Sequence, residues 1–166
     1  IRSMRASSAP SVRARAASID FSVRLAEASA APSGMVLVPA TDLPIALASP
    51  DVPVSLPAFF IDQFEVTNRE YLEFVDAGGY DSSEYWHSLP LGRTNENWRT
   101  TVARFVDATG RPGPATWEVG RHPEGAGDHP VTGVSWFEAA AYARFRGKSL
   151  PTAYHWYRAA FALNES

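Results

Sequence analysis

The side chains that most often perform catalysis are sparse in this sequence and lie far apart along it. The chain has no cysteine, so these residues supply no thiolate nucleophile, no thiolate metal ligand and no disulfide. None of its histidines (His87, His122, His129 and His155) shows the i, i+4 spacing of a helical zinc site, and no acidic cluster accompanies them. We therefore predict no catalytic residue and no metal site within these 166 residues.

The remaining polar candidates favour structural roles. Asp62 and Glu65 are interpreted as surface or turn-fixing carboxylates rather than as a general acid and base. His129, in the motif Asp128–Val131, is interpreted as a hydrogen-bonding turn residue rather than a ligand or base. The sequence contains no Ser-His-Asp order, no P-loop and no dinucleotide fingerprint.

Three aromatic residues are candidates for binding rather than for chemistry. Tyr85, Trp86 and Trp117 fall in stretches expected to be loops, where exposed aromatic side chains often mark recognition. The first hypothesis is that they form the wall of a substrate pocket. The alternative is that they fill the core of a fold rich in loops, as tryptophans often do.

Composition and charge exclude two kinds of partner. The net charge is −3, whereas a nucleic-acid site needs a concentrated basic face. No apolar run approaches the roughly 20 residues that cross a bilayer, so we expect no membrane segment in this chain. A hydrophobic share of 45% and a charged share of 20% are ordinary for a globular domain.

The first 33 residues differ from the rest of the chain. They carry five arginines against two acidic residues, a net charge of +3, and are rich in alanine and serine. We interpret residues 1–33 as a linker or the remnant of a preceding β module, since Ser18–Leu25 alternates apolar and polar residues as a strand does. An organellar transit peptide is the alternative for the first eighteen residues.

Two helix starts are signalled by capping boxes, in which a hydroxyl and a carboxylate three residues apart each bond the other residue's backbone N–H. Thr67 with Glu70 forms the first and Ser135 with Glu138 the second. The glycines at Gly78–Gly79 and Gly147 are expected to end the two helices. Trp136 is expected to face inward from the second helix.

A third helix is expected to begin at Thr152, with Trp156 facing inward. Its capping position pairs Thr152 with His155 instead of a carboxylate, which predicts a weaker start. Helical spacing also predicts an extra helix over Thr94–Asp107. Strands are expected at Met35–Val38, Val54–Leu56 and Phe59–Ile61. Together these patterns predict an α+β fold.

The segments that carry these signals also resemble a known family. The stretches FEVTN and GGY around the first helix, DHPVTGVSW before the second and GKSLPTAYHWYRAA at the third occur in the order and approximate spacing of the formylglycine-generating enzyme, or sulfatase-modifying factor, domain. The resemblance spans residues 34–160. It implies a compact C-type-lectin-like fold, with residues 34–166 as the N-terminal part of a domain that is incomplete at its C-terminus.

The resemblance offers three functions. In the first, the parent protein is a copper-dependent oxidase that converts a sulfatase cysteine to formylglycine; copper and the reacting cysteines would belong to a missing C-terminal half, and this chain would hold no cofactor. The implied partners are then that missing half and a sulfatase or peptide substrate. The second is a non-catalytic ligand-binding or sensory module of a kinase-linked bacterial protein. The third is membership of the related non-haem iron group that forms sulfur–carbon bonds.

Two observations favour the kinase-linked reading. The segment RPGPATWEVGRHPEG resembles an insert of that branch. In addition, the sulfatase-maturing branch carries a cysteine and a tryptophan where this chain has Ala143 and Phe145.

Overall fold

A computed structural model describes residues 31–40, 55–87, 89–90 and 97–161. The chain divides into two units, Ile1–Ala30 and Ala31–Ser166. The first unit, which includes the predicted strand Ser18–Leu25, lies outside the described residues, and everything below concerns the second. None of the helices in the described ranges is long and apolar enough to cross a membrane.

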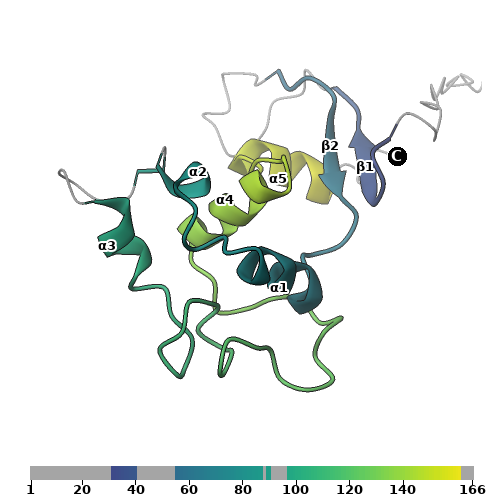
Figure 1. Cartoon of the computed structure of the whole chain (residues 1–166). Helices are drawn as coiled ribbons and strands as arrows, with labels where there is room; N and C mark the ends of the chain where they lie inside the picture. Colours follow the sequence, from purple (N-terminus) through teal and green to yellow (C-terminus); the bar gives the residue numbers. More distant parts are fainter. Residues whose placement is uncertain (1–30, 41–54, 88, 91–96, 162–166) are drawn as a thin grey trace, which may run out of the picture. The chain divides into compact units, whose positions relative to one another are not determined.

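Two short strands form a small antiparallel sheet (Figure 1). Strand β1 covers Met35–Val38 and strand β2 covers Phe59–Asp62, with Met35 opposite Asp62 and Val38 opposite Phe59. The strands predicted at Met35–Val38 and Phe59–Ile61 are confirmed, whereas Val54–Leu56 begins outside the described residues. The sheet is only partly covered, because Val36, Leu37 and Phe60 are each about 40% exposed.

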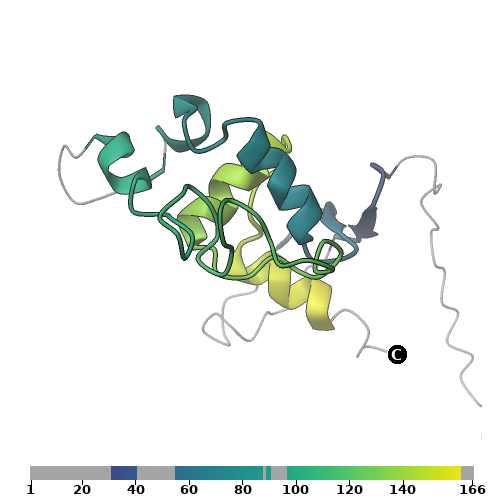
Figure 2. The same ribbon diagram turned by 60° about the horizontal axis from the view of Figure 1, so that its bottom comes forward.

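Helix α1 spans Asn68–Asp76 and helix α4 spans Trp136–Phe145; Figure 2 shows them side by side. Each begins at its predicted capping box and is followed by a glycine with positive φ, 71° at Gly78 and 69° at Gly147. The next residue, Gly79, must also be glycine, because a Cβ there would lie 2.1 Å from the Phe74 ring. The chain can therefore turn back tightly against α1.

Two shorter helices follow α1. Helix α2, Ser83–Trp86, contains Tyr85 and Trp86, so these residues do not lie in a loop. Helix α3, Trp98–Val102, is shorter than the predicted helix over Thr94–Asp107, whose first residues lie outside the described ranges. Its end at Val102 corrects that prediction: Val106 instead pairs with Pro112 in an isolated antiparallel bridge.

The long connection between α3 and α4 is organised by one buried carboxylate. Asp107 is 4% exposed, and its Oδ1 accepts the backbone N–H groups of Thr109 at 2.7 Å and Arg111 at 3.0 Å. Its Oδ2 accepts the Gly120 N–H at 2.6 Å. Burial alone would raise the pKa of Asp107, but the hydrogen bonds from Gly120, Arg111 and Thr109 together hold it well below its usual range.

The core lies where α1, α2 and α4 meet this connection. Its largest fully buried side chains are Trp86, Trp117, Tyr71, Phe74 and Pro114. The Trp117 indole donates to the Asn68 side chain at 2.9 Å, which satisfies its N–H inside the core. Helix α5, Ala153–Phe161, contributes no buried residue. The helices together with the small antiparallel sheet confirm the predicted α+β class.

Candidate functional site

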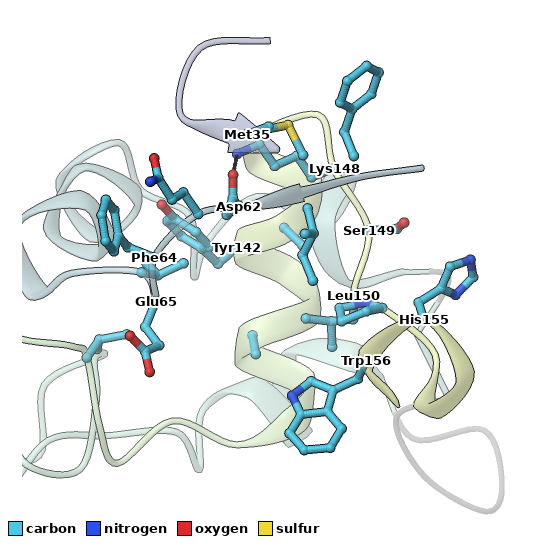
Figure 3. Close-up of a pocket in the computed structure, with 18 of the residues that line it drawn as sticks. Met35, Asp62, Phe64, Glu65, Tyr142, Lys148, Ser149, Leu150, His155 and Trp156 are labelled. Carbon is cyan, nitrogen blue, oxygen red and sulfur yellow. Dashed lines mark hydrogen bonds and ion pairs between the residues drawn. The ribbon is translucent and has the colours of Figure 1, made fainter. Parts of the chain in front are cut away.

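An open groove of about 940 Å³ separates the sheet from helices α4 and α5 (Figure 3). One wall is formed by β2 and the turn after it, and the opposite wall by the segment that joins α4 to α5. The residues that line it are mainly apolar: Pro32, Met35, Phe59–Val66, Tyr71, Pro130, Val131, Val134, Ala139, Tyr142, Ala143, Gly147–Pro151, His155 and Trp156.

Helix α4 supplies the floor of the groove. Its Ala139 and Ala143 are small, so the backbone of α4 can be approached closely. Tyr142 lines the groove and also stacks on Tyr71 of α1, with ring centroids 5.1 Å apart. Burial raises the pKa of Tyr142 to about 12, so its phenol stays neutral across the physiological range. The floor therefore offers apolar contact without a titrating group.

Charge enters the groove at its rim. Lys148 Nζ lies 2.5 Å from Asp62 Oδ1, and the dashed line in Figure 3 marks this ion pair. Both side chains are about one-third exposed. The pair joins the two walls of the groove, because Asp62 ends β2 and Lys148 follows α4.

Large aromatic side chains stand open at the two ends of the groove. Phe64 is 75% exposed at one end, and Trp156 is 59% exposed at the other, beside His155 (Figure 3). His155 packs edge-on against Phe59, with ring centroids 4.7 Å apart. The expectation that Trp156 and Trp136 face inward is wrong for the described residues, since Trp136 is 57% exposed. Such exposure of several large apolar side chains is typical of a surface that receives a partner.

The capping boxes fix the elements that frame the groove. In the first box, the Thr67 N–H donates to Glu70 Oε2 at 2.8 Å and the Glu70 N–H donates to the Thr67 hydroxyl at 3.3 Å. The bond from the Thr67 backbone lowers the pKa of Glu70. In the second box, the Ser135 N–H donates to Glu138 Oε2 at 2.7 Å. Both predicted boxes are thus present.

The start of α5 is capped differently. The His155 N–H donates to the Thr152 hydroxyl at 3.3 Å, as in the other two helices. The His155 imidazole then bonds the same hydroxyl, Nδ1 to Oγ1 at 2.6 Å. His155 therefore contacts only the hydroxyl of Thr152, whereas Glu70 and Glu138 each accept the backbone N–H of their capping residue, and Glu70 also accepts the Thr67 hydroxyl at 2.8 Å.

A buried hydrogen-bond chain connects the second box to α1. Glu138 is 3% exposed, and its Oε1 accepts the Tyr80 hydroxyl at 2.6 Å. The Tyr80 and Tyr71 hydroxyls lie 3.2 Å apart. Burial raises the pKa of both tyrosines, so they remain neutral donors. This chain locks the start of α4 against α1 beneath the groove and was not anticipated from the sequence.

The three aromatic residues predicted to line a pocket belong largely to the core. Trp86 and Trp117 are each 0% exposed, and Tyr85 packs partly buried against the same core cluster. The Trp86 indole donates to the Gly79 carbonyl at 2.8 Å. The Trp117 indole likewise has an acceptor inside the core, the Asn68 side chain, so both buried tryptophans have their N–H groups satisfied. None of the three residues lines the groove beside β2.

His129 acts through its backbone. Its carbonyl accepts the Asn68 N–H at 2.9 Å, and its own N–H donates to the Ala126 carbonyl at 3.1 Å, so it fixes a turn against the start of α1. Within the described ranges, no three side chains among histidine, cysteine, aspartate and glutamate form a group able to hold a metal ion.

Sequence reasoning missed the residues that make the groove. Ile61 lies in β2 and Leu150 lies between α4 and α5. Nothing in the sequence around either residue indicated that the two would line one groove. A usable signal was the density of apolar residues from Phe59 to Val66, which continue past the end of the strand at Asp62.

Comparisons with known proteins identify a family model and several relatives. Residues 21–165 match the family model described as "Sulfatase-modifying factor enzyme 1-like domain". The chain is similar to a hercynine oxygenase of Mycolicibacterium smegmatis, with 38% identity over 107 residues, covering 64% of this chain and 24% of that protein. It is also similar to the formylglycine-generating enzyme of Bos taurus, with 33% identity over 144 residues, covering 75% of this chain and 38% of that enzyme.

A third relative is the serine/threonine-protein kinase Pkn1 of Chlamydia trachomatis, with 32% identity over 103 residues, covering 62% of this chain and 14% of the kinase. In all three comparisons the chain spans well under half of the relative's length.

Proposed function

The chain belongs to the sulfatase-modifying factor family, and from this premise we propose that its parent protein oxidises a cysteine of a sulfatase to formylglycine, with these residues serving as scaffold. The carrying observation is the open apolar groove, which exposes Phe64 and Trp156 at its ends. A face of this kind is unfavourable in water unless another polypeptide covers it. The groove therefore supports a role in holding a partner rather than in transferring protons or electrons.

The donor set of the chain does not fit a copper site. Copper(I) prefers soft thiolate or thioether ligands, and the sequence has no cysteine and only two methionines. Of these, Met35 stands on the groove wall next to the Asp62–Lys148 ion pair, without a second soft ligand among the groove-lining residues. We derive no reaction step through copper from these residues and assign that chemistry to the rest of the parent.

We further propose that the groove receives the C-terminal half of a C-type-lectin-like domain. Three properties support this: a strand on one wall, small alanines on the floor and aromatic side chains at both ends. A polypeptide laid along the groove would cover Phe64 and Trp156 together. The isolated chain should accordingly bind a hydrophobic dye, and the separately produced C-terminal half should displace it.

A second candidate is a non-catalytic binding module of a kinase-linked protein. The observation that favours it is Ala143, which is 8% exposed, lines the groove and stands where the sulfatase-maturing motif carries a cysteine. The similarity to the kinase Pkn1 supports the same candidate. Under this proposal the completed groove binds a ligand without turning it over.

One experiment separates the candidates. The parent protein is incubated with copper, oxygen and a cysteine-containing sulfatase peptide, and mass spectrometry follows the conversion of the thiol to an aldehyde. Conversion by the parent, absent with this chain alone, is expected for the oxidase; binding without conversion identifies the module. Conversion by this chain alone would overturn the scaffold role.

Groove variants test the scaffold role directly. Leu150→Asp places a charge on the groove wall and should prevent the chain from associating with the C-terminal half. Val36→Asp is the matched control, because Val36 is 41% exposed and does not line the groove. Equal association of both variants would show that the C-terminal half docks elsewhere.

A further inference from the structure

Strand β2 is paired along one edge and open along the other. Its only partner strand among the described residues is β1, because the sheet has two strands. Of β1 only Met35 lines the groove, whereas all four residues of β2 do. Figure 3 shows Met35 on one side of β2 and Leu150 and Trp156 on the other. The open edge of β2 therefore belongs to the groove.

The register of the sheet identifies the backbone groups on that edge. In an antiparallel ladder, hydrogen-bonded and non-hydrogen-bonded residue pairs alternate. The Gln63 N–H donates to the Gly34 carbonyl at 2.9 Å, which makes theirs a hydrogen-bonded pair. The neighbouring pair, Met35 with Asp62, is consequently non-hydrogen-bonded, and so is the pair of Phe60 two residues along. The N–H and C=O groups of Phe60 and Asp62 therefore point away from β1.

Backbone groups at this spacing form a template for another strand. Phe60 and Asp62 lie two residues apart, which is the spacing at which an added antiparallel strand finds successive hydrogen-bonding sites. Among the described residues, no hydrogen bond from outside the sheet reaches their N–H groups. Natural proteins often protect an open edge with lysine or proline, and β2 contains neither. The edge is thus suited to pairing with a further strand.

We propose that β2 accepts a third strand along this edge, and that the C-terminal half of the domain supplies it. This inference rests on the proposed function for the identity of the partner and adds how it docks, through main-chain hydrogen bonds to Phe60 and Asp62. The compared relatives are more than twice as long as the part that this chain matches. Helix α5, the last described element, begins at the groove, where His155 and Trp156 line it.

The floor of the groove restricts the side chains of such a strand. Successive side chains of a strand point to opposite faces, so every second one would be directed toward α4. There it would meet Ala139, Tyr142 and Ala143, which offer apolar contact and room for close approach. The added strand should therefore carry apolar residues at alternate positions.

Amide hydrogen exchange, followed residue by residue by NMR in this chain and in the parent protein, tests the edge directly. In this chain the Phe60 and Asp62 amides should exchange at least about tenfold faster than that of Ile61, which faces β1. In the parent, exchange at Phe60 and Asp62 should slow by at least about a hundredfold. Leu37 is the matched control, because its N–H lies on the outer edge of β1, away from the groove, and should not change.

Two outcomes of the exchange measurement would overturn the proposal. In the first, Phe60 and Asp62 exchange as fast in the parent as in this chain, so no strand covers the edge. In the second, both amides become protected in this chain as its concentration is raised, which would assign the edge to a second copy.

Proline variants give an independent readout, because proline removes the backbone donor and is tolerated at an open edge. In the parent, Phe60→Pro should lower the thermal midpoint more than Phe60→Ala, which removes the same side chain and keeps the N–H. In this chain, Phe60→Pro and Leu37→Pro should lower the midpoint about equally, since each removes an outward N–H. Equal losses for Phe60→Pro and Phe60→Ala in the parent would contradict a hydrogen bond at this position.

Turnover by the parent separates this proposal from the proposed function. Conversion of the sulfatase cysteine, with Phe60 and Asp62 still exchanging rapidly, would overturn the third strand and leave the oxidase standing. Protection of both amides in a parent that does not convert the cysteine would support the strand and overturn the oxidase.

Discussion

Two regions of this molecule each contain several aromatic residues and differ in what covers them. Around α1 and α4, Tyr71, Phe74 and Trp117 are at most 1% exposed, and their rings contact one another. Around β2 and α5, Phe64 and Trp156 are more than half exposed. Both regions carry the same local sequence signals, namely a capping hydroxyl before the helix and apolar residues at helical or strand spacing.

The difference shows that these local signals determine where helices and strands form, but not which of their side chains are buried. Helix α4 belongs to both regions, since Tyr142 stacks on Tyr71 toward the core and lines the groove on the other side. Helix α5 is amphipathic like α1, although less strongly, yet none of its residues is buried. No other part of the described residues covers the apolar side chains of α5. Our proposal is that the rest of the domain packs against them.

The largest expected contrast is between two tryptophans. Trp117→Ala should lower the free energy of unfolding by about 3–5 kcal/mol, because it leaves a cavity and deprives the Asn68 side chain of its indole partner. Trp156→Ala should change it by less than about 1 kcal/mol, since its side chain is already largely in water. Urea denaturation followed by far-ultraviolet circular dichroism measures both; similar losses would show that α5 is packed in solution.

A second contrast concerns pH and the buried carboxylate of the core region. The folded state holds the pKa of Asp107 below its ordinary value of 3.8, so its charged form stabilises the fold above that pH. This contribution is lost progressively as the pH falls below 3.8, toward the lower pKa of the folded state. Asp107→Asn should therefore be less stable at pH 7 and lose less further stability between pH 4 and pH 2 than the native chain. Parallel pH curves for the two proteins would contradict the role of the carboxylate.

Much of the first region could be predicted from the sequence because its signals are local. The boxes at Thr67 and Ser135 and the glycine stop at Gly78 each depend on residues within one or two turns of a helix. The start of α5 after Thr152 follows the same rule. The family assignment also follows from short motifs, and residues 21–165 confirm it.

The groove and the loop organisation could not be predicted because they depend on contacts between distant residues. Glu138 meets Tyr80 and Lys148 meets Asp62 across long stretches of sequence. The end of α3 at Val102 was missed because Asp107 turns the following chain through bonds to Thr109, Arg111 and Gly120. Trp136 and Trp156 were expected inside and are exposed, because helical spacing alone leaves the burial of a side chain undetermined; for Trp86 and Trp117 the sequence left pocket wall and core both open.

The helix caps give a smaller contrast between the regions. Thr67→Ala and Ser135→Ala should each lower the free energy of unfolding by about 0.5–2 kcal/mol, since a helix N–H loses its acceptor next to the core. Thr152→Ala should cost less, because α5 buries no residue and can fray without exposing more surface. Equal shifts in the urea midpoint for Thr67→Ala and Thr152→Ala would mean that α5 is as tightly coupled to the fold as α1.

The smallest contrast is between two ion pairs. The Arg69–Asp128 pair on the α1 side joins side chains that are 67% and 77% exposed, whereas the Lys148–Asp62 pair on the groove rim is about half as exposed. Water and salt screen the first pair strongly, so Asp128→Asn should change the free energy of unfolding by less than about 0.5 kcal/mol. Asp62→Asn should cost somewhat more, up to about 1 kcal/mol, and the cost should fall as salt is raised.

Once the C-terminal half covers the groove, Lys148 would be left unpaired in a drier site, so Asp62→Asn should then weaken association more than it weakens the isolated chain. Equal effects on the isolated and the completed protein would show that this rim stays in water.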